Sequence, residues 1–562
     1  MKILSIYPWT HISSAALMIN NKLIAASAEE RFTRVKWTTQ FPINSANWCL
    51  KKAGITWKDL DRIVVPWNPS ININSSSSRW DGNISWRGEM LSNIPSNVMK
   101  ALNSDPSKDM TVSFGNTKIV YLSHHDSHIA SAIFIAPFSK CDFLTIDGHG
   151  EKESCVFGYY NGKKIVRKKS ISYPHSVGLL YGTFTDFLGF KPDNEEWKTM
   201  ALASFSTKKN NFDLKFKSIY KLTTSGFELD LSFFDYYLFD KQKNFYNKKL
   251  IDLFGPPRKK SEKITARHHN IAGALQRAFT NIVFHLLKLV KKDGGKSNNI
   301  IIAGGAAMNC VFNGVLEDKS LYKKKFIPPW PDDLGVSVGS VFLMNHMMGR
   351  KMIKDNNVYL GPNYTNSEIL SLLKKYKLKY HKPTNINKYI ANEIAKGQLV
   401  GWFQNRMEFT HRALGNRSIL ADPRNKSMKD KINLAVKYRE SFRPFAPATI
   451  ENHASKIFKI KKGLKVEYME KAVFVRKSWL NKIPSVIHVD GTARLQTVNS
   501  KFNKKFFNLI NEFYKITKVP VLLNTSFNLN GEPIVMTPSD AIRTFNTCGL
   551  DILVLEDYVI KK

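Results

Sequence analysis

The chain has 562 residues, of which 43% are hydrophobic, enough for a large core and typical of two to four domains. It has no run of about eighteen apolar residues and only five cysteines, without a CxxC pair, so we expect no membrane span, disulfide framework or thiolate zinc site, and a reducing cytoplasm as the compartment. The formal net charge of +38 would suit nucleic acid, but the basic clusters are short and scattered, so we do not expect a nucleic-acid partner.

A strand followed by a polar turn and a hairpin occurs twice in the first 170 residues. The apolar segments of the first copy are residues 2–7, 15–19 and 23–26, and those of the second are 141–147, 155–160 and 164–167. Further strands are predicted at 62–65, 118–122 and 299–303, and helices at 43–53 and 271–291. The repeat predicts two halves of one nucleotide-binding domain facing each other across a cleft. A smaller α/β unit is expected from about residue 355, which makes the fold class α/β.

Two histidines and two aspartates form a candidate metal site. His124 and His128 lie four apart in SHHDSHIASA and would share one face of a helix, although the segment could also be an ordinary capped helix start. Asp147 ends an apolar strand in TIDGHGE, where the alternative is a plain turn, and Asp333 precedes Leu334-Gly335. Such a mixed nitrogen and oxygen set argues against a soft thiolate-type metal but does not choose among iron, zinc and manganese.

A predicted strand also runs into Gly304-Gly305, and a helix is predicted to begin after this glycine pair. This arrangement presents backbone N–H groups to an anion. It matches neither the dinucleotide fingerprint nor the P-loop, and glycine pairs also mark simple tight turns.

Cations are densest between residues 405 and 448, among apolar and turn residues instead of a solvated run. Arginine forks match phosphate and carboxylate geometry, so several of them in one pocket would suit a polyphosphate and a second anion. The alternative is structural ion pairing with Glu408, Asp422 and Glu440. Two later segments, HVDGTARLQTV and NTSFNLNGEPIVMTPSDAI, add an arginine, an amide and small hydroxyls that can bind phosphate or a carbamoyl group.

Taken together, RALGNRSILADPR, FRPFAPA, HVDGTARLQTV and NTSFNLNGEPIV, preceded in order by HHDSHIASA, DGHGE and GGAAMN, resemble the carbamoyltransferase family that includes the nodulation-factor and tobramycin enzymes. The resemblance covers nearly the whole chain. It implies that residues 1–350 form an actin-like, duplicated (ribonuclease-H-like) domain similar to the tRNA threonylcarbamoyl transferase TsaD, with a metal site. It implies a YrdC-like α/β domain that forms carbamoyladenylate over residues 351–562.

The resemblance also implies an activity. The second domain would use carbamoyl phosphate and ATP, with magnesium, to make carbamoyladenylate and release pyrophosphate. The first domain would pass the carbamoyl group to a hydroxyl of a small molecule. Its metal is iron in the best-known relative, and the acceptors of the family suggest a sugar or a glycosylated metabolite. A homodimer is compatible with the sequence, which does not itself reveal the oligomeric state.

Residue roles carried over from the family fall into four groups. The metal ligands would be His124, His128, Asp147 and Asp333. The catalytic residues would be His11, as general base unless it is a satisfied turn histidine, and Lys36. The nucleotide and carbamoyladenylate group would be Gly148, Lys198, Gly304, Gly305 and Asn309. The pocket for carbamoyl phosphate and ATP would contain Arg412, Arg417, Ser418, Lys437, Arg439, Arg443, Arg494, Asn524 and Ser526.

The sequence departs from the family pattern at Ile12, where aspartate is usual, at Trp197 and Ala201, which replace glycines, and at Asn405, Thr410 and His411 before the RALG motif. Two other interpretations stay open. One is a tRNA-modifying enzyme, since both domains resemble partners in threonylcarbamoyladenosine synthesis and the chain is basic; the other is a non-catalytic nucleotide-binding scaffold, which Trp197 and Ala201 favour. Residues 208–263 show no clear periodicity of hydrophobic residues, so no helix or strand is predicted there. Because loops shape acceptor pockets, this segment is where we expect acceptor-binding loops.

Overall fold

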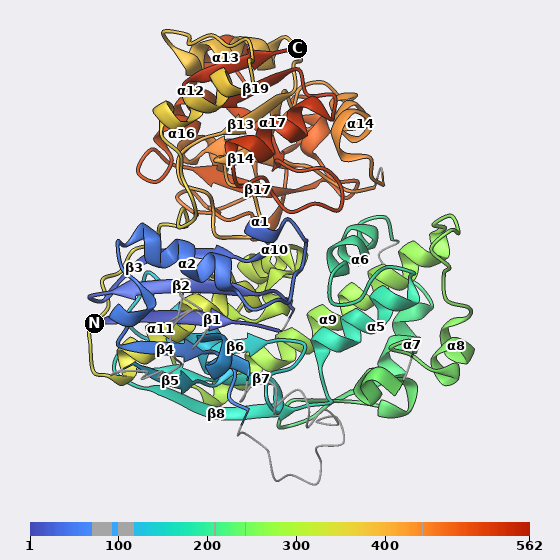
Figure 1. Ribbon diagram of the computed structural model, residues 1–562. Helices are drawn as coiled ribbons and strands as arrows, with labels where there is room; N and C mark the ends of the chain where they lie inside the picture. Colours follow the sequence, from blue (N-terminus) through green and yellow to red (C-terminus); the bar gives the residue numbers. More distant parts are fainter. Residues whose placement is uncertain (10, 70–92, 99–116, 207–208, 242, 441) are drawn as a thin grey trace. The chain divides into compact units, whose positions relative to one another are not determined.

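The computed structural model describes residues 1–562 except 10, 70–92, 99–116, 207–208, 242 and 441 (Figure 1). The chain divides into two compact units. The first comprises Met1–Glu29, Trp37–Asn309 and Val315–Asn356, and the second comprises Glu30–Lys36, Cys310–Gly314 and Asn357–Lys562. Among the described residues, none of the helices combines the length and the apolarity needed to cross a bilayer.

The first unit contains two five-stranded sheets with the same topology. One has the order β3-β2-β1-β4-β5, with β1 (Lys2–Tyr7), β2 (Ser14–Ile19), β3 (Lys22–Ala28), β4 (Arg62–Val65) and β5 (Lys118–Tyr121). The other has the order β8-β7-β6-β11-β12, with β6 (Cys141–Ile146), β7 (Glu153–Tyr160), β8 (Ile165–Ser172), β11 (Asn299–Ala303) and β12 (Lys324–Phe326). In both sheets the first three strands form an antiparallel meander and the last two run parallel to the first strand. The predicted internal duplication and the α/β class are therefore confirmed.

Two helices at equivalent places in the duplication cross at close range. Helix α4 (His124–Ile133) follows β5, and helix α11 (Val336–Met347) follows β12. They approach at Gly339, where an added Cβ would lie 1.8 Å from the carbonyl oxygen of Ser127, so only glycine fits. This contact fixes the N-terminal halves of α4 and α11 against each other.

The remaining helices of the first unit are α2 (Ile43–Lys52), α5 (Val177–Phe187), α6 (Glu196–Ala203), α7 (Phe212–Ser218), α8 (Lys248–Phe254), α9 (Ala266–Asp293) and α10 (Cys310–Lys319), the first turn of which belongs to the second unit. In Figure 1, α5 to α9 gather beside the sheets as a separate helical layer. The stretch that sequence patterns left unassigned thus forms helices and a short hairpin of β9 (Tyr220–Leu222) and β10 (Phe227–Leu229).

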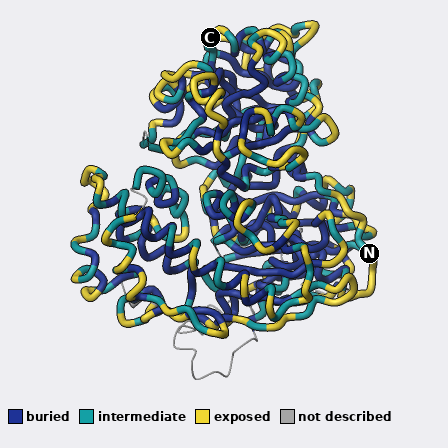
Figure 2. The backbone as a smooth tube through the Cα atoms, turned by 180° about the vertical axis from the view of Figure 1, so that it is seen from behind, coloured by how far each residue is buried: buried dark blue, intermediate teal, exposed yellow. Residues whose placement is uncertain are grey.

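The second unit is built on a mixed eight-stranded sheet with the order β16-β17-β15-β18-β14-β13-β19-β20. Its strands are β13 (Val400–Phe403), β14 (Arg417–Ala421), β15 (Ala446–Ile450), β16 (Lys471–Phe474), β17 (Thr492–Val498), β18 (Val521–Ser526), β19 (Ile552–Leu555) and β20 (Tyr558–Lys561). The helices are α12 (Asn366–Lys375), α13 (Ile386–Ala395), α14 (Met428–Ile432), α15 (Glu451–Ile457), α16 (Lys504–Thr517) and α17 (Pro538–Asn546). Most residues of these strands are apolar and buried, and Figure 2 shows buried backbone through the middle of this unit.

Two short segments from the first third and the middle of the chain complete this second unit. After α1 (Glu30–Thr33), the Arg34 guanidinium donates to the carbonyl oxygens of Pro533 at 2.8 Å and Ile534 at 2.7 Å. Near residue 310, the Asn313 amide donates to the Glu470 carbonyl at 2.9 Å. No sequence pattern pointed to these segments, because their partners are 150 to 500 positions away.

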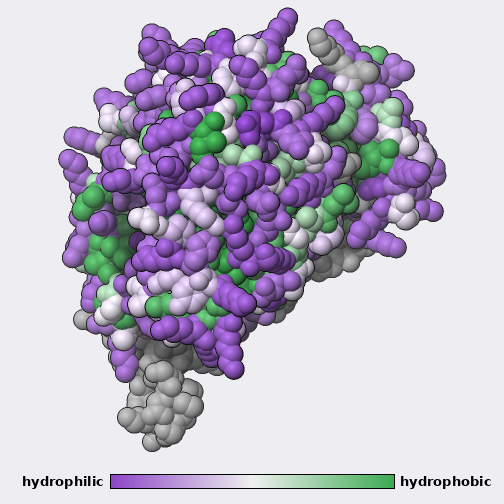
Figure 3. Space-filling view, turned by 90° about the horizontal axis from the view of Figure 1, so that it is seen from above, coloured by the Kyte–Doolittle hydropathy of each residue, from purple (hydrophilic) through white to green (hydrophobic). Residues whose placement is uncertain are grey.

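The face seen in Figure 3 is covered mainly by hydrophilic side chains, with apolar ones in small scattered groups. This matches the scattered basic clusters of the sequence.

Candidate functional site

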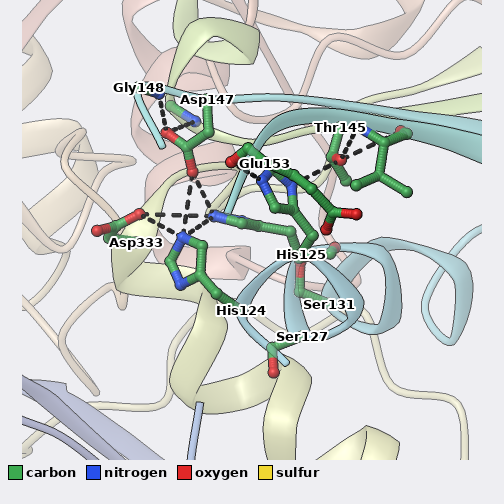
Figure 4. Close-up of polar contacts among 12 residues, drawn as sticks. His124, His125, Ser127, Ser131, Thr145, Asp147, Gly148, Glu153 and Asp333 are labelled. Carbon is green, nitrogen blue, oxygen red and sulfur yellow. Dashed lines mark hydrogen bonds and ion pairs between the residues drawn. The ribbon is translucent and has the colours of Figure 1, made fainter. Parts of the chain in front are cut away.

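Two histidines and two aspartates meet in the first unit (Figure 4). His124 and His128 extend from one face of α4, Asp147 follows β6, and Asp333 precedes α11. The Nε2 atom of His128 lies 2.7 Å from Asp147 Oδ2, 3.1 Å from His124 Nε2 and 3.5 Å from Asp333 Oδ1. His124 Nε2 lies 3.3 Å from Asp147 Oδ2 and 3.5 Å from Asp333 Oδ1. One ligand atom from each residue therefore falls within 4.8 Å of all the others.

Neighbouring groups orient the two carboxylates. The backbone N–H groups of Gly148 and Gly305 donate to Asp147 Oδ1, at 2.8 and 3.2 Å. The Tyr7 hydroxyl donates to Asp333 Oδ2 at 2.8 Å. Each carboxylate thus has one oxygen engaged by the protein and directs the other toward the histidines, an arrangement in which outer partners set ligand direction.

The chemistry of this cluster fits a divalent cation. Burial alone would lower the pKa of His124, but the carboxylates of Asp333 and Asp147 raise it well above its usual range. Burial likewise opposes ionisation of Asp333, yet the two histidines hold the pKa of that carboxyl well below its usual range. Ligand atoms bound about 2.0–2.2 Å from one metal lie about 3–3.5 Å apart, close to the separations found here. A bound cation would replace the shared protons that otherwise hold these four groups together.

His125 points away from this cluster, as its place on α4 predicts. Its ring bonds Thr145 Oγ1 at 2.9 Å and the Glu153 carbonyl at 2.8 Å, and burial lowers its pKa to about 3. Glu151, which sequence reasoning did not select, accepts the backbone N–H of His124 at 2.8 Å. Its position in the DGHGE motif was a signal for it, whereas Tyr7 in an apolar strand carried none.

The other residues predicted for this unit have the following places. His11 follows β1, its ring centroid is 5.0 Å from that of Trp37, and it lies within electrostatic range of Asp193. The adjacent Ile12 is fully buried, so this departure from the family packs in the core. Lys198 pairs with Glu195 at 2.6 Å.

The predicted nucleotide-binding glycines and Asn309 are engaged within the protein. The N–H groups of Gly148 and Gly305 point at Asp147, as described above, and Gly304 turns with a φ of 91° where a Cβ would meet the Ile146 carbonyl. Asn309 exchanges two amide hydrogen bonds with Gln276 of α9, at 2.9 and 3.2 Å. A nucleotide role for these four residues therefore stays a prediction, and the geometry gives the glycines a role in shaping the metal-type cluster.

A set of cations meets in the second unit. Burial, followed by Arg439, Arg443 and Lys36, holds the pKa of Lys437 well below its usual range. Burial, Arg443 and Arg494 do the same to the pKa of Arg439. Lys437 ends a π-helical turn and donates to the Ser526 carbonyl at 2.5 Å and to Asn528 Oδ1 at 2.8 Å.

Two of the carboxylates suggested as ion-pair partners have different places. Arg443 pairs with Glu440 at 3.4 Å, whereas Asp422 pairs with Arg424, outside the predicted set. Arg412 belongs to the same neighbourhood, since it and Arg494 both lower the pKa of the Cys310 thiol, which burial raises. We call Lys36, Arg412, Lys437, Arg439, Arg443 and Arg494 the cation cluster.

Arg417 has a different environment from the cation cluster. Its side chain is fully buried, and its four terminal N–H groups donate to the carbonyls of Gln404, Asn416, Pro362 and Asn405. Its guanidinium also lies 3.5 Å from the centroid of the Phe403 ring. Glu408, suggested as an ion-pair partner, accepts backbone N–H groups of Leu414, Asn416 and Arg417 instead. The terminal N–H groups of Arg417 are thus used by backbone carbonyls, and its buried Nε–H alone has no hydrogen-bond partner among the described residues. We therefore leave Arg417 out of the anion pocket proposed below.

Ser418, Asn524 and Ser526 lie on neighbouring strands β14 and β18. Ser418 Oγ accepts the N–H of Gly415 at 3.1 Å, and Ser526 Oγ donates to Asn528 Oδ1 at 2.7 Å. Among the departures from the family, Asn405 has a φ of 46°, a left-handed conformation that asparagine tolerates better than most residues in place of glycine. Thr410 bridges its own loop through a 2.8 Å bond from the N–H of Arg412.

With this geometry in hand, the comparisons with known proteins decide the family. The carbamoyltransferase N-terminus model matches residues 2–342, and the carbamoyltransferase C-terminus model matches residues 391–562. The chain belongs to the carbamoyltransferase family. This carbamoyltransferase is 33% identical to nodulation protein NolNO of Sinorhizobium fredii over 98% of its own length and 79% of that protein.

Two further relatives support the same membership. Nodulation protein NolO of Bradyrhizobium diazoefficiens is 36% identical over 78% of this carbamoyltransferase and 79% of its own chain. The uncharacterised Synechocystis protein sll1178 is 35% identical over 100% of this chain and 96% of its own. The resemblance found from sequence motifs, and the expectation of a carbamoyl-transferring enzyme, are thereby confirmed.

Proposed function

We propose that this carbamoyltransferase activates a carbamoyl group with ATP in its second unit and transfers it to a hydroxyl of a sugar or glycosylated metabolite in its first unit. Carbamoyl phosphate and water would give carbamate and phosphate. A carbamate oxygen would then attack the α-phosphorus of ATP, so that carbamoyladenylate forms and pyrophosphate leaves. The acceptor hydroxyl would attack the carbamoyl carbon, lose its proton and release AMP.

The observation that carries this proposal is the cation cluster. Its cations lie close enough together that Arg439, Arg443 and Lys36 lower the pKa of Lys437, and Arg443 and Arg494 lower the pKa of Arg439. Such repulsion destabilises the folded protein unless anions offset it. Each bond from a charged donor to a phosphate oxygen contributes about 1.5–3 kcal/mol, so a triphosphate and an acyl phosphate would suit the cluster.

For the second step we propose that His124, His128, Asp147 and Asp333 hold a divalent metal, iron first and zinc or manganese otherwise. When bound, the metal would act as a Lewis acid on the carbamoyl carbonyl. Tyr7, Gly148 and Gly305 would keep the ligating oxygens in position. His11 would accept the proton of the acceptor hydroxyl. Lys36, a member of the cation cluster of the second unit, would bind the phosphate of the adenylate as it forms there.

The first test measures pyrophosphate release from purified protein with ATP, magnesium and carbamoyl phosphate. We expect release from the wild type and a loss of at least about tenfold in Arg443→Met, a cation-cluster variant. Arg476→Met, an exposed arginine of the same unit, is the matched control and should keep full activity. If the wild type binds ATP but releases no pyrophosphate, the result would favour a non-catalytic scaffold and contradict the proposal.

The second test follows carbamoyl transfer and bound metal in His128→Ala. This variant should lose both while it still releases pyrophosphate, because the activating residues lie in the other unit. Monosaccharides, glycosylated metabolites and tRNA should be offered as acceptors in parallel. Transfer to tRNA alone would support the tRNA-modifying interpretation and overturn the small-molecule acceptor.

A further inference from the structure

One of two buried hydrogen-bond acceptors lies within electrostatic range of Arg494 of the cation cluster, and the other is on the same sheet as Arg494. They are Nε2 of His488 and Oδ1 of Asn524, and neither has a hydrogen-bond partner among the described residues. Leaving a buried polar atom unpaired costs stability, so each such atom requires an explanation. In a cluster otherwise made of donors, two acceptors point to a ligand that carries N–H groups.

The bonding of His488 fixes which of its nitrogens is the acceptor. The Thr492 hydroxyl donates to Asp490 Oδ1 at 2.7 Å, because a carboxylate can only accept. Thr492 Oγ1 must therefore accept from His488 Nδ1, which lies 3.0 Å away. The proton of the neutral ring is on Nδ1, and Nε2 presents a lone pair. Burial lowers the pKa of His488 to about 4; Asp490 opposes this shift, and Arg494 and Lys429 add to it. The ring is therefore neutral at pH 7.

A chain of amide bonds fixes the orientation of Asn524 in the same way. Gln496 Nε2 donates to the Leu414 carbonyl at 3.0 Å, so Gln496 Oε1 is the atom that meets Asn524. It accepts from Asn524 Nδ2 at 2.8 Å, and that nitrogen also donates to the Ala413 carbonyl at 3.0 Å. Asn524 is only 1% exposed, and its Oδ1 is left as an acceptor in the interior.

The register of the sheet places Asn524 and Arg494 on one face. Asn524 of β18 is opposite Ala446 of β15. Ala448 of β15 is level with Gln496 of the parallel strand β17, so Ala446 is level with Arg494, two residues earlier in both strands. The three residues form a row across neighbouring strands, and the middle one, Ala446, has the shortest side chain of the three.

We propose that His488 Nε2 and Asn524 Oδ1 accept the two N–H bonds of the carbamoyl amino group and so select carbamoyl phosphate over other acyl phosphates. The cation cluster supplies only donors, which suit phosphate and carbonyl oxygens but cannot recognise an amino group. Acetyl phosphate has the same shape with a methyl group in that place and would leave both acceptors buried and unpaired. A site built to bond an N–H rejects an analogue that lacks it far better than a site that senses size alone.

The test replaces His488 by asparagine or glutamine, whose amide groups reach the positions of the imidazole Nδ1 and Nε2 atoms, respectively. In His488→Asn the amide nitrogen replaces Nδ1 and keeps the bond to Thr492, but the acceptor is lost; in His488→Gln the amide oxygen replaces Nε2. In His488→Asn, the kcat/KM for pyrophosphate release should fall at least about tenfold with carbamoyl phosphate but stay within about twofold of wild type with acetyl phosphate. In His488→Gln, the kcat/KM with carbamoyl phosphate should recover. The KM for ATP should not change.

The inference rests on the proposed function, so a second readout is independent of turnover. Calorimetry compares phosphonoacetamide with acetonylphosphonate, stable analogues that differ only in NH2 against CH3. We expect wild type and His488→Gln to prefer the amide, and His488→Asn to lose that preference. Equal binding of the two analogues by the wild type, equal losses with both acyl phosphates, or an effect confined to the KM for ATP would overturn the assignment. Absence of pyrophosphate from the wild type with the amide preference intact would instead contradict the activation step alone.

Discussion

Replacing Arg417 by methionine tests whether this buried arginine holds the second unit together or binds substrate. Of the four carbonyls that its guanidinium bonds, those of Pro362 and Asn416 also accept backbone N–H groups, from Met407 and Gln404. The loss in Arg417→Met therefore falls mainly on the Gln404 and Asn405 carbonyls. At about 1–3 kcal/mol for each stranded group, the free energy of unfolding should fall by about 2–6 kcal/mol.

Urea unfolding followed by tryptophan fluorescence measures this change, and Trp402, fully buried on the adjacent strand β13, reports on the region directly. Arg476→Met, which removes an exposed guanidinium with one bond to the Ser455 carbonyl, should shift stability by less than about 0.5 kcal/mol. Pyrophosphate release per folded molecule should survive in Arg417→Met. Wild-type stability combined with abolished release would show that Arg417 acts on substrate and refute this reasoning.

Three further outcomes are expected. Tyr7→Phe removes the hydroxyl that orients Asp333 and should weaken metal binding about 10–100-fold, as measured by competition with a chelator. Gly339→Ala would normally favour a helix, but its Cβ would lie 1.8 Å from the Ser127 carbonyl, so thermal unfolding should show a loss of about 1–3 kcal/mol together with lower metal content. Burial, and then the charge of Asp193, raise the pKa of Glu196 from 4.5 to about 8, so the folded protein keeps a proton that the unfolded chain releases. The free energy of unfolding should therefore decline as the pH rises from about 4.5 through 8. Denaturant titrations should show a smaller decline in Glu196→Gln.

Each of these outcomes has a result that would contradict it. Unchanged metal affinity in Tyr7→Phe, while Asp333→Ala abolishes binding, would show that the hydroxyl does not orient the ligand. A Gly339→Ala variant as stable as an exposed substitution on the same helix, Met347→Ala, would mean that α4 and α11 separate at no cost. A Glu196→Gln variant with the same pH dependence as the wild type would place the titrating group elsewhere.

Local sequence was enough to predict features that depend on neighbouring residues. The spacing of His124 and His128 places both on one helical face whatever surrounds them, and a strand that ends at Asp147 exposes its carboxylate at the edge of a sheet. The repeated hairpin predicted the duplication, because both copies use the same short-range alternation and turns.

Tertiary structure decided which polar groups are already engaged. The motif around Arg417 looks the same in sequence whether its guanidinium faces a ligand or four backbone carbonyls, and only the fold brings Gln404 and Pro362 to it. Tyr7 is 326 residues from Asp333, and Arg34 is about 500 from its carbonyl partners, so no local pattern could reveal either contact. Amino-acid order thus determined the local elements and the types of chemical group. Three-dimensional packing decided which donors and acceptors remain for a ligand, because hydrogen bonds join groups by distance in space and not by position in the chain.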